Sequence, residues 1–195
     1  MELPKDYEET EGITGDYETL KAGGYICKIV GAKAETSQAG NEMLVLALDI
    51  AEGEHKGYFQ RRFEDAKKQN TDVNKQVKWS NNGTHRIMKL DKEGKCNKFF
   101  KGFGTIIEES NSGYKWTGNE ESLKDKVLGC IFGEEEYEKM DESIGTAVKV
   151  KFIRSVKCIQ DGNFKVPEKK KLVRNENAFG DFQTMSGDSD DDLPF

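Results

Sequence analysis

The chain has 195 residues, of which 34% are charged and 35% are hydrophobic, and its formal net charge is −6. This length supports one core-forming domain with appendages. The sequence contains no apolar run of roughly eighteen residues, so we expect no transmembrane helix, and its acidic start does not resemble a signal peptide. The cysteines stand far apart, which favours reduced core thiols over a disulfide framework. We therefore expect a cytoplasmic protein. The four cysteines are Cys27, Cys96, Cys130 and Cys158.

The charge is distributed unevenly along the chain. Residues 1–21 and 180–195 each carry a net charge of −5, whereas residues 22–179 carry +4. Within this body, residues 56–101 have thirteen basic and five acidic side chains, and residues 149–174 have nine and two. A solvated surface explains any one such segment, but two basic segments on predicted strands favour a positive groove.

The first two predicted strands are Gly24–Ala34 and Glu42–Ile50, joined by a polar turn segment. In the first strand, Cys27 and Ile29 share one face. In the second, apolar residues alternate strictly along one face, which is the pattern of a half-buried strand. That face consists of Leu44, Leu46, Leu48 and Ile50.

A turn bounded by Gly53 and Gly57 leads into a third predicted strand, Tyr58–Phe63. Its Phe59 and Phe63 are expected to face the core, which leaves Tyr58 and Arg62 facing outward. Arg61 shares the parity of the two phenylalanines and is expected inward or at a rim. A short helical turn is predicted from Thr84 to Leu90.

One amphipathic helix precedes the last two strands. Its predicted apolar stripe consists of Cys96, Phe99, Phe100, Phe103 and Ile107. The fourth strand is Lys126–Phe132. The fifth is Thr146–Cys158, with inward and outward residues alternating. Its inward residues are Val148, Val150 and Phe152, and its outward residues are Lys149, Lys151 and Ile153.

This order predicts a mainly β fold, a five-stranded OB-fold barrel with a helical insertion between strands three and four. A β-sandwich is the alternative, disfavoured because it needs about seven strands. We assign an acidic arm to residues 1–20, the OB-fold domain to residues 21–175, and a disordered acidic tail to residues 176–195.

The tail ends in an acidic and then apolar tip. The aspartates Asp190, Asp191 and Asp192 precede Leu193, Pro194 and Phe195. A terminal Phe with its carboxylate can enter an apolar pocket with a basic rim on a partner protein, and the aspartates add electrostatic steering. A merely solubilising tail would explain the aspartates but not the apolar tip. We therefore expect these six residues to bind a partner.

The tip resembles that of bacterial single-stranded DNA-binding protein. The body resembles the single-stranded DNA-binding proteins that phages and prophages encode. The segments that carry this resemblance cover most of residues 20–170; they are EMLVLALDIAEGEHKG (42–57), FFKGFGTIIEESNSGYKW (99–116), LGCIFGEEEY (128–137) and RSVKCIQDGNFKVP (154–167). The resemblance implies an OB fold, single-stranded DNA binding in phage replication or recombination within the host cytoplasm, and recruitment of replication, recombination and repair proteins.

Single-strand binding without sequence preference needs cations along a groove and aromatic rings on which bases stack. In an OB fold this groove crosses strands two and three. Trp79 lies in a polar run, where stacking on bases and packing in the protein are equally open, whereas Trp116 is expected to pack. The residues expected to bind DNA are Lys28, Tyr58, Arg61, Arg62, Lys67, Lys68, Lys78, Trp79, Arg86, Lys149 and Lys151.

Catalytic alternatives find little support. Asp49, Glu54 and Lys56 match the pattern of a metal-dependent nuclease, but the flanking glycines predict a turn rather than a strand that gathers them. Two histidines without paired cysteines do not predict a zinc site, so we expect no enzyme and no cofactor. The alternative function is a recombination mediator or annealing accessory protein that acts mainly through protein partners. The sequence leaves open whether the protein is a monomer or a dimer.

Overall fold

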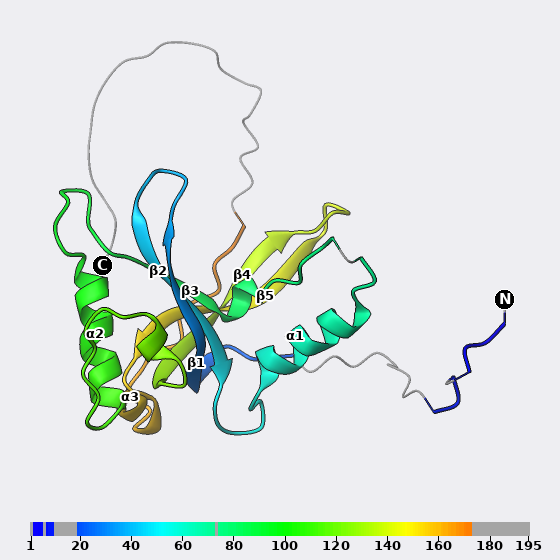
Figure 1. Ribbon diagram of the computed structural model, residues 1–195, viewed down its shortest axis with the longest axis horizontal. Coiled ribbons are helices and arrows are strands. Elements are labelled where there is room, and N and C mark those ends of the chain that lie inside the picture. Colours follow the sequence, from blue (N-terminus) through cyan, green and yellow to red (C-terminus); the bar gives the residue numbers. More distant parts are fainter. Residues whose placement is uncertain (1, 6, 10–18, 73, 173–195) are drawn as a thin grey trace, which may run out of the picture.

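The computed structural model of the protein describes residues 2–5, 7–9, 19–72 and 74–172. It consists of a five-stranded antiparallel sheet in the order β3-β2-β1-β4-β5, with helices around it (Figure 1). The strands are β1 (Gly23–Thr36), β2 (Glu42–Ile50), β3 (Thr84–Met88), β4 (Val127–Glu138) and β5 (Ile144–Arg154). The helices are α1 (Tyr58–Gln69), α2 (Lys98–Ser110) and α3 (Val156–Gln160), with 3-10 turns η1 (Asn81–Gly83) and η2 (Glu121–Leu123).

The predicted third strand is wrong, because Tyr58–Phe63 forms the first half of α1. Phe59 and Phe63 are four residues apart, a spacing that fits one face of a helix as well as one face of a strand. Asp49 of β2 decides between them: its Oδ1 accepts hydrogen bonds from the backbone N–H groups of Phe59 (2.9 Å) and Gln60 (3.4 Å). A carboxylate at this position stabilises the start of a helix.

The third strand in chain order is β3, where the sequence predicted a helical turn. Its Ile87 lies opposite Leu44 of β2 and is buried in the core. Pairing with β2 supplies both backbone hydrogen bonds and a core position, so it prevails over the weak local preference for a helical turn. The predictions of the first, second, fourth and fifth strands are confirmed in position, although β4 extends further and β5 ends at Arg154.

Two β-bulges change which side chains face outward. In β1, Val30 is an extra residue between Ile29 and Gly31, so Lys33 lies on the same face as its neighbour Val45 of β2. In β5, Lys151 is the extra residue, which turns Phe152 outward and Ile153 into the core. The predicted inward Phe152 and outward Ile153 are therefore wrong, because a bulge shifts the alternation by one residue.

The core lies between the sheet, α2 and the first turn of α1. Phe103 and Ile107 of α2 are buried against it, as the apolar stripe predicts. The first members of the stripe are not: Phe99 is 80% exposed and Cys96 precedes the helix as an exposed residue. Cys27 and Cys130 are buried thiols, and burial raises the pKa of Cys130 above its ordinary value.

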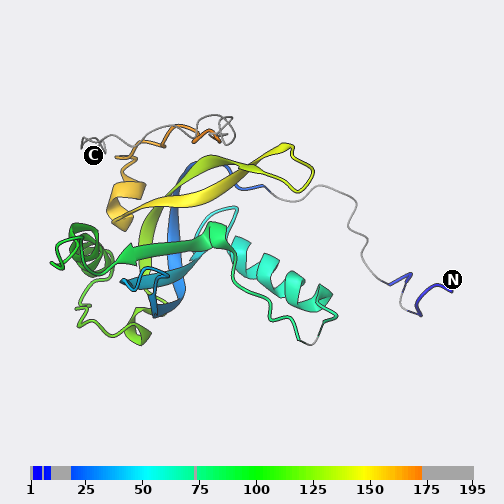
Figure 2. The ribbon, with the colours of Figure 1, turned by 90° about the horizontal axis from the view of Figure 1, so that it is seen from above.

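The sheet is not closed into a barrel by a ladder of hydrogen bonds. β3 and β5 form its two edges and approach each other beside α2, without pairing in the described part of the chain. Two views at right angles, Figures 1 and 2, show α1 and α2 at opposite ends of the sheet. The helical insertion expected between the third and fourth strands is therefore confirmed as α2, whereas the closed barrel is not.

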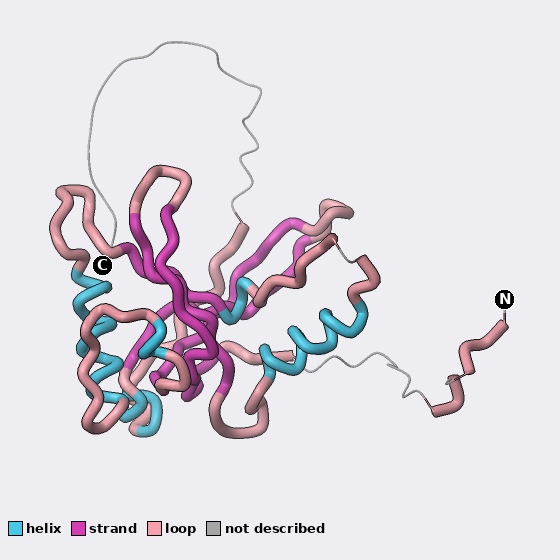
Figure 3. Tube along the Cα trace, viewed as in Figure 1, coloured by secondary structure: helices cyan, strands magenta, loops and turns pink. Residues whose placement is uncertain are grey.

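After α3 the chain returns along β4 (Figure 3). The backbone N–H of Lys170 donates to the carbonyl of Glu134 (3.0 Å), and the N–H of Glu136 donates to the carbonyl of Lys170 (2.9 Å). These bonds form an isolated parallel bridge on the half of β4 that extends past its pairing with β1. Lys169 and Lys170 therefore lie against the acidic part of β4.

Of the helices in the described ranges, none has the length and apolar character that crossing a membrane requires. The predicted tail, 176–195, lies outside the described residues, and so do its six tip residues.

Candidate nucleic-acid interface

A groove runs over the outer face of β1, β2 and β3. We call it the sheet groove. Its volume is about 670 Å³, and the segment of residues 76–81 forms one wall. The three neighbouring strands supply the floor, which includes the apolar side chains of Val45 and Ala47. Three cations and one acid line it: Lys33, Lys78, Arg86 and Glu35.

The cations of the sheet groove are exposed and come from three separate segments. Lys33 forms an ion pair of 2.5 Å with Glu35, and this hydrogen bond lowers the pKa of Glu35, to which Arg86 also contributes. Arg86 donates to Asn81 Oδ1 at 3.3 Å. Glu35 therefore offsets one of three positive charges and leaves the groove with a net positive lining.

Trp79 forms part of the wall and is half-buried. Its ring lies 5.3 Å from that of Phe63 of α1, and its Nε1 donates to the carbonyl of Gly83 at 3.3 Å. Both contacts fix the indole between α1 and η1, so packing accounts for much of its surface. Trp116 packs as expected, with its ring 5.0 Å from Phe103.

The residues expected on a third strand lie on α1 instead. Tyr58 is only 7% exposed, and its hydroxyl accepts a hydrogen bond from Arg62 at 2.7 Å. The prediction that Tyr58 faces outward is wrong, because the first turn of α1 packs into the core. The basic residues of α1 are exposed, but none of them lines the sheet groove; they are Arg61, Arg62, Lys67 and Lys68.

Lys149 and Lys151 of β5 converge on Glu135 of β4. Their Nζ atoms lie 3.3 Å and 2.8 Å from Glu135 Oε2, and Lys170 lies 3.4 Å from Oε1. The hydrogen bond from Lys151 is the largest cause that lowers the pKa of Glu135 to about 2. These lysines are therefore held within an acidic surface and do not line the sheet groove. Lys28, half-buried in β1, does not line it either.

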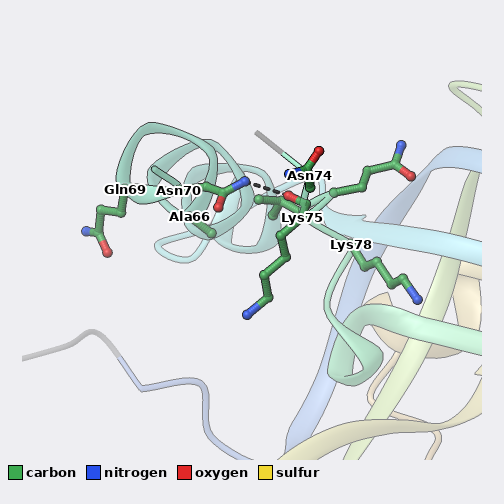
Figure 4. Close-up of a pocket in the computed structure, with 8 residues that line it drawn as sticks. Ala66, Gln69, Asn70, Asn74, Lys75 and Lys78 are labelled. Atoms are coloured by element: carbon green, nitrogen blue, oxygen red, sulfur yellow. Dashed lines mark hydrogen bonds between the residues drawn. The ribbon is translucent and has the colours of Figure 1, made fainter. Parts of the chain in front are cut away.

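A further hollow of about 780 Å³ lies between the end of α1 and residues 74–78. Asn70 Nδ2 donates to the carbonyl of Lys75 at 2.6 Å and fixes this segment to the helix (Figure 4). Lys78 lines both this hollow and the sheet groove. The hollow is open to solvent and lies between α1 and the wall of the sheet groove.

The structure thus brings Lys78, Trp79 and Arg86 together from the predicted set, and adds Lys33 and Asn81. Sequence reasoning missed Lys33 because unbroken alternation from Cys27 and Ile29 points it into the core. Only the bulge at Val30 turns it outward.

The pattern of a nuclease is not assembled by this fold. Asp49 is fully buried at the start of α1, whereas Glu54 and Lys56 are exposed in the turn that precedes the helix. In the described ranges, we find no cluster of three or more His, Cys, Asp or Glu side chains that could hold a metal ion.

Comparison with known proteins gives a match over part of the chain. Residues 6–91 match a family model described as "Protein of unknown function (DUF669)". We found no match to this chain among curated proteins. The matched range includes β1, β2, α1 and β3, and so the three strands and the wall that line the sheet groove.

Proposed function

We propose that this protein binds single-stranded DNA in the sheet groove and performs no catalysis. The observation that carries the proposal is the joint presence of exposed cations and apolar surface in one groove across three strands. Lys78 and Arg86 line the groove together with Val45, which is the register partner of Arg86 in β2. Cations along a groove bind the phosphates of a strand, and apolar or aromatic walls accept its bases.

An unpaired strand fits this groove better than a duplex. The segment of residues 76–81 and the three strands line the same groove, so a ligand in the groove can contact both the wall and the sheet. Bases of a single strand can turn toward the floor and the exposed edge of Trp79. In a duplex the bases are paired and stacked, so only phosphates could reach Lys33, Lys78 and Arg86.

We further propose that the sheet is an OB-type arrangement. β1, β2 and β3 precede α2, which is followed by β4 and β5; α1 is inserted between β2 and β3. The sheet order places β1 between β2 and β4. The two edges, β3 and β5, approach each other beside α2, as in a barrel that is partly open. In such folds the outer face of strands two and three binds nucleic acid, which is the location of the sheet groove.

Fluorescence anisotropy with labelled oligothymidylate of about 12 nucleotides tests this function, with duplex DNA and RNA of equal length for comparison. We expect the single strand to bind more tightly than the duplex. The logarithm of affinity should fall with the logarithm of salt concentration by about 0.7 per phosphate contact. Absence of single-strand affinity at low salt would contradict the proposal and favour a mediator that acts through protein partners.

The proposal extends to partner recruitment by the tail tip, Asp190–Phe195. Its support is the sequence alone: three acidic residues followed by Leu193, Pro194 and Phe195. A buried aromatic anchor commonly supplies most of the affinity of such a contact. We expect Phe195→Ala to abolish recovery of replication and repair proteins from host extract, with single-strand affinity unchanged. Equal recovery by both proteins would show that the tip does not recruit them.

A further inference from the structure

We propose that a second groove, between β3, α2 and β5, is a stacking subsite in which unpaired bases of the same DNA strand contact Phe99 and Phe152. We call it the edge groove. It has a volume of about 450 Å³ and is separate from the sheet groove, from which it is divided by the edge strand β3. This inference rests on the proposed function and extends the DNA path beyond the three-strand face.

Two phenylalanines of the edge groove present aromatic surface to solvent. Phe99, in the first turn of α2, is 80% exposed, and Phe152 of β5 is 44% exposed. Removing the surface of such a ring from water by contact with another apolar surface is favourable. The bulge at Lys151 is the reason that Phe152 faces outward at all. Both rings therefore offer faces to which a ligand can bind.

The charge of the edge groove favours an anionic ligand. Its lining includes the cations Arg86, Lys98, Lys151 and Arg154, and no Asp or Glu is among the described residues that line it. Lys151 is hydrogen-bonded to Glu135 at 2.8 Å, whereas Lys98 and Arg154 are exposed at the surface. Cations beside exposed rings are the combination that single-stranded nucleic acid requires, because phosphates and bases alternate along the strand.

Arg154 strengthens this assignment through its position. Its guanidinium lies 5.6 Å from the centre of the Phe152 ring, and its Nη1 donates to the carbonyl of Ile153 at 2.9 Å. A guanidinium plane held in this way can itself stack on a base while it neutralises a phosphate. His85, which also lines the groove, stays uncharged at neutral pH because burial lowers its pKa to about 4.

Arg86 connects the two grooves. It belongs to the edge strand β3, and it lines both the sheet groove and the edge groove. Arg86 therefore places a cation where a strand that leaves the sheet groove could turn around β3 toward Phe99. This continuity favours nucleic acid over an apolar peptide as the occupant, because an apolar peptide has no negative charge to complement the cations around the rim.

The test measures the affinity of the full chain for oligothymidylate of about 12 nucleotides in the wild type, Phe99→Ala, Phe152→Ala and Phe99→Tyr. We expect each alanine variant to bind about tenfold more weakly, the loss that follows when one base no longer stacks. Phe99→Tyr should bind as the wild type does, because tyrosine retains an aromatic face. Since Phe99 is mostly exposed, its replacement should leave the melting temperature unchanged.

Met140→Ala is the matched control, because Met140 is a fully exposed apolar residue in the turn between β4 and β5, outside both grooves. It should bind as the wild type does. If Phe99→Ala and Phe152→Ala also bind as the wild type does, the edge groove is not a base-stacking subsite, and the proposed function still stands. If the wild type itself does not bind the oligonucleotide, the proposed function fails and this inference with it.

A labelled peptide of residues 186–195 provides the third arm of the experiment. It carries the acidic and apolar residues of this chain that could occupy an apolar groove with a basic rim. The inference predicts that Phe99→Ala weakens oligonucleotide binding more than any binding of the peptide. The inference is overturned if Phe99→Ala weakens peptide binding alone, because the edge groove would then be a peptide site.

Discussion

The two basic segments of this chain differ in what lies opposite them. Residues 56–101 supply Lys78 and Arg86 to the sheet groove, where Glu35 is the one acid among the described residues of the lining. In the described part of residues 149–174, four lysines form ion pairs with Glu135 and Glu136 of β4. Those lysines are Lys149, Lys151, Lys169 and Lys170.

Counting charges along the sequence therefore overestimates the positive charge that the second segment can offer to a ligand. Its net charge is +7, but Lys149, Lys151, Lys169 and Lys170 lie beside Glu135 and Glu136, which belong to an acidic stretch of the chain. These ion pairs neutralise the four lysines locally, whereas Arg154 of the same segment lines the edge groove. A basic segment predicts a nucleic-acid interface only where the tertiary structure leaves it without acidic neighbours.

The largest effect on stability is expected for Trp79→Ala. This change removes the side chain that holds the wall of the sheet groove, residues 76–81, against α1 and η1. Loss of its contacts with Phe63 and Gly83 should lower the free energy of unfolding by about 2 kcal/mol, less than for a fully buried aromatic residue. Thermal and urea denaturation would measure this. A large loss of DNA affinity with unchanged stability would instead show that Trp79 stacks on bases rather than packing in the protein.

Replacing the cations of each segment tests the comparison directly. Lys78→Ala with Arg86→Ala should weaken single-strand binding about tenfold and reduce the salt slope by about 1.4, for two lost phosphate contacts. The matched pair, Lys149→Ala with Lys170→Ala, should have much less effect because both lysines are already paired with Glu135. Anisotropy titrations at several salt concentrations give both values; equal losses for the two pairs would refute the distinction.

Glu135→Gln should leave the second segment, like the first, with lysines that have no acidic partner at this position. Without this carboxylate, Lys149, Lys151 and Lys170 lose their shared partner, and single-strand affinity should rise about threefold through the added positive field. Stability at neutral pH should fall by about 0.5 kcal/mol, since partly exposed ion pairs contribute little. Because the folded-state pKa of Glu135 is about 2, this stabilisation is present above pH 4.5 and is lost as the pH falls toward 2. Denaturation of both proteins across this range checks the sign.

His85 gives the smallest expected effect at neutral pH, and it concerns the edge strand β3. Its folded-state pKa is about 4, below the ordinary 6.5, because burial disfavours the charged form. The unfolded chain therefore binds a proton between pH 6.5 and 4 that the folded protein does not, so stability falls as the pH decreases through this window. His85→Asn should flatten that part of the stability curve. An unchanged curve would show that another group titrates there.

The sequence predicts most of the fold and only part of the site. Strong alternation identified β1, β2, β4 and β5, and the helical stripe identified α2. The errors at Tyr58–Phe63 and Thr84–Leu90 occurred where local spacing was ambiguous and distant partners decided the outcome: Asp49 for α1, and β2 for β3.

The missed site residues have a common physical cause. Lys33 and Phe152 each follow a bulge, and one extra residue in a strand moves every later side chain to the opposite face. The bulge position depends on the partner strand, which periodicity within a single strand cannot reveal. Bulges commonly re-aim side chains beside binding sites, and here they supply one residue to each groove.

Amide chemical-shift changes on adding oligothymidylate to isotope-labelled protein test the central claim most directly. The account predicts the largest changes at Lys78, Thr84 and Arg86 around the sheet groove, and small changes at Lys149 and Lys170. Largest changes in the cluster around Glu135, or no changes in either region at low salt, would contradict it.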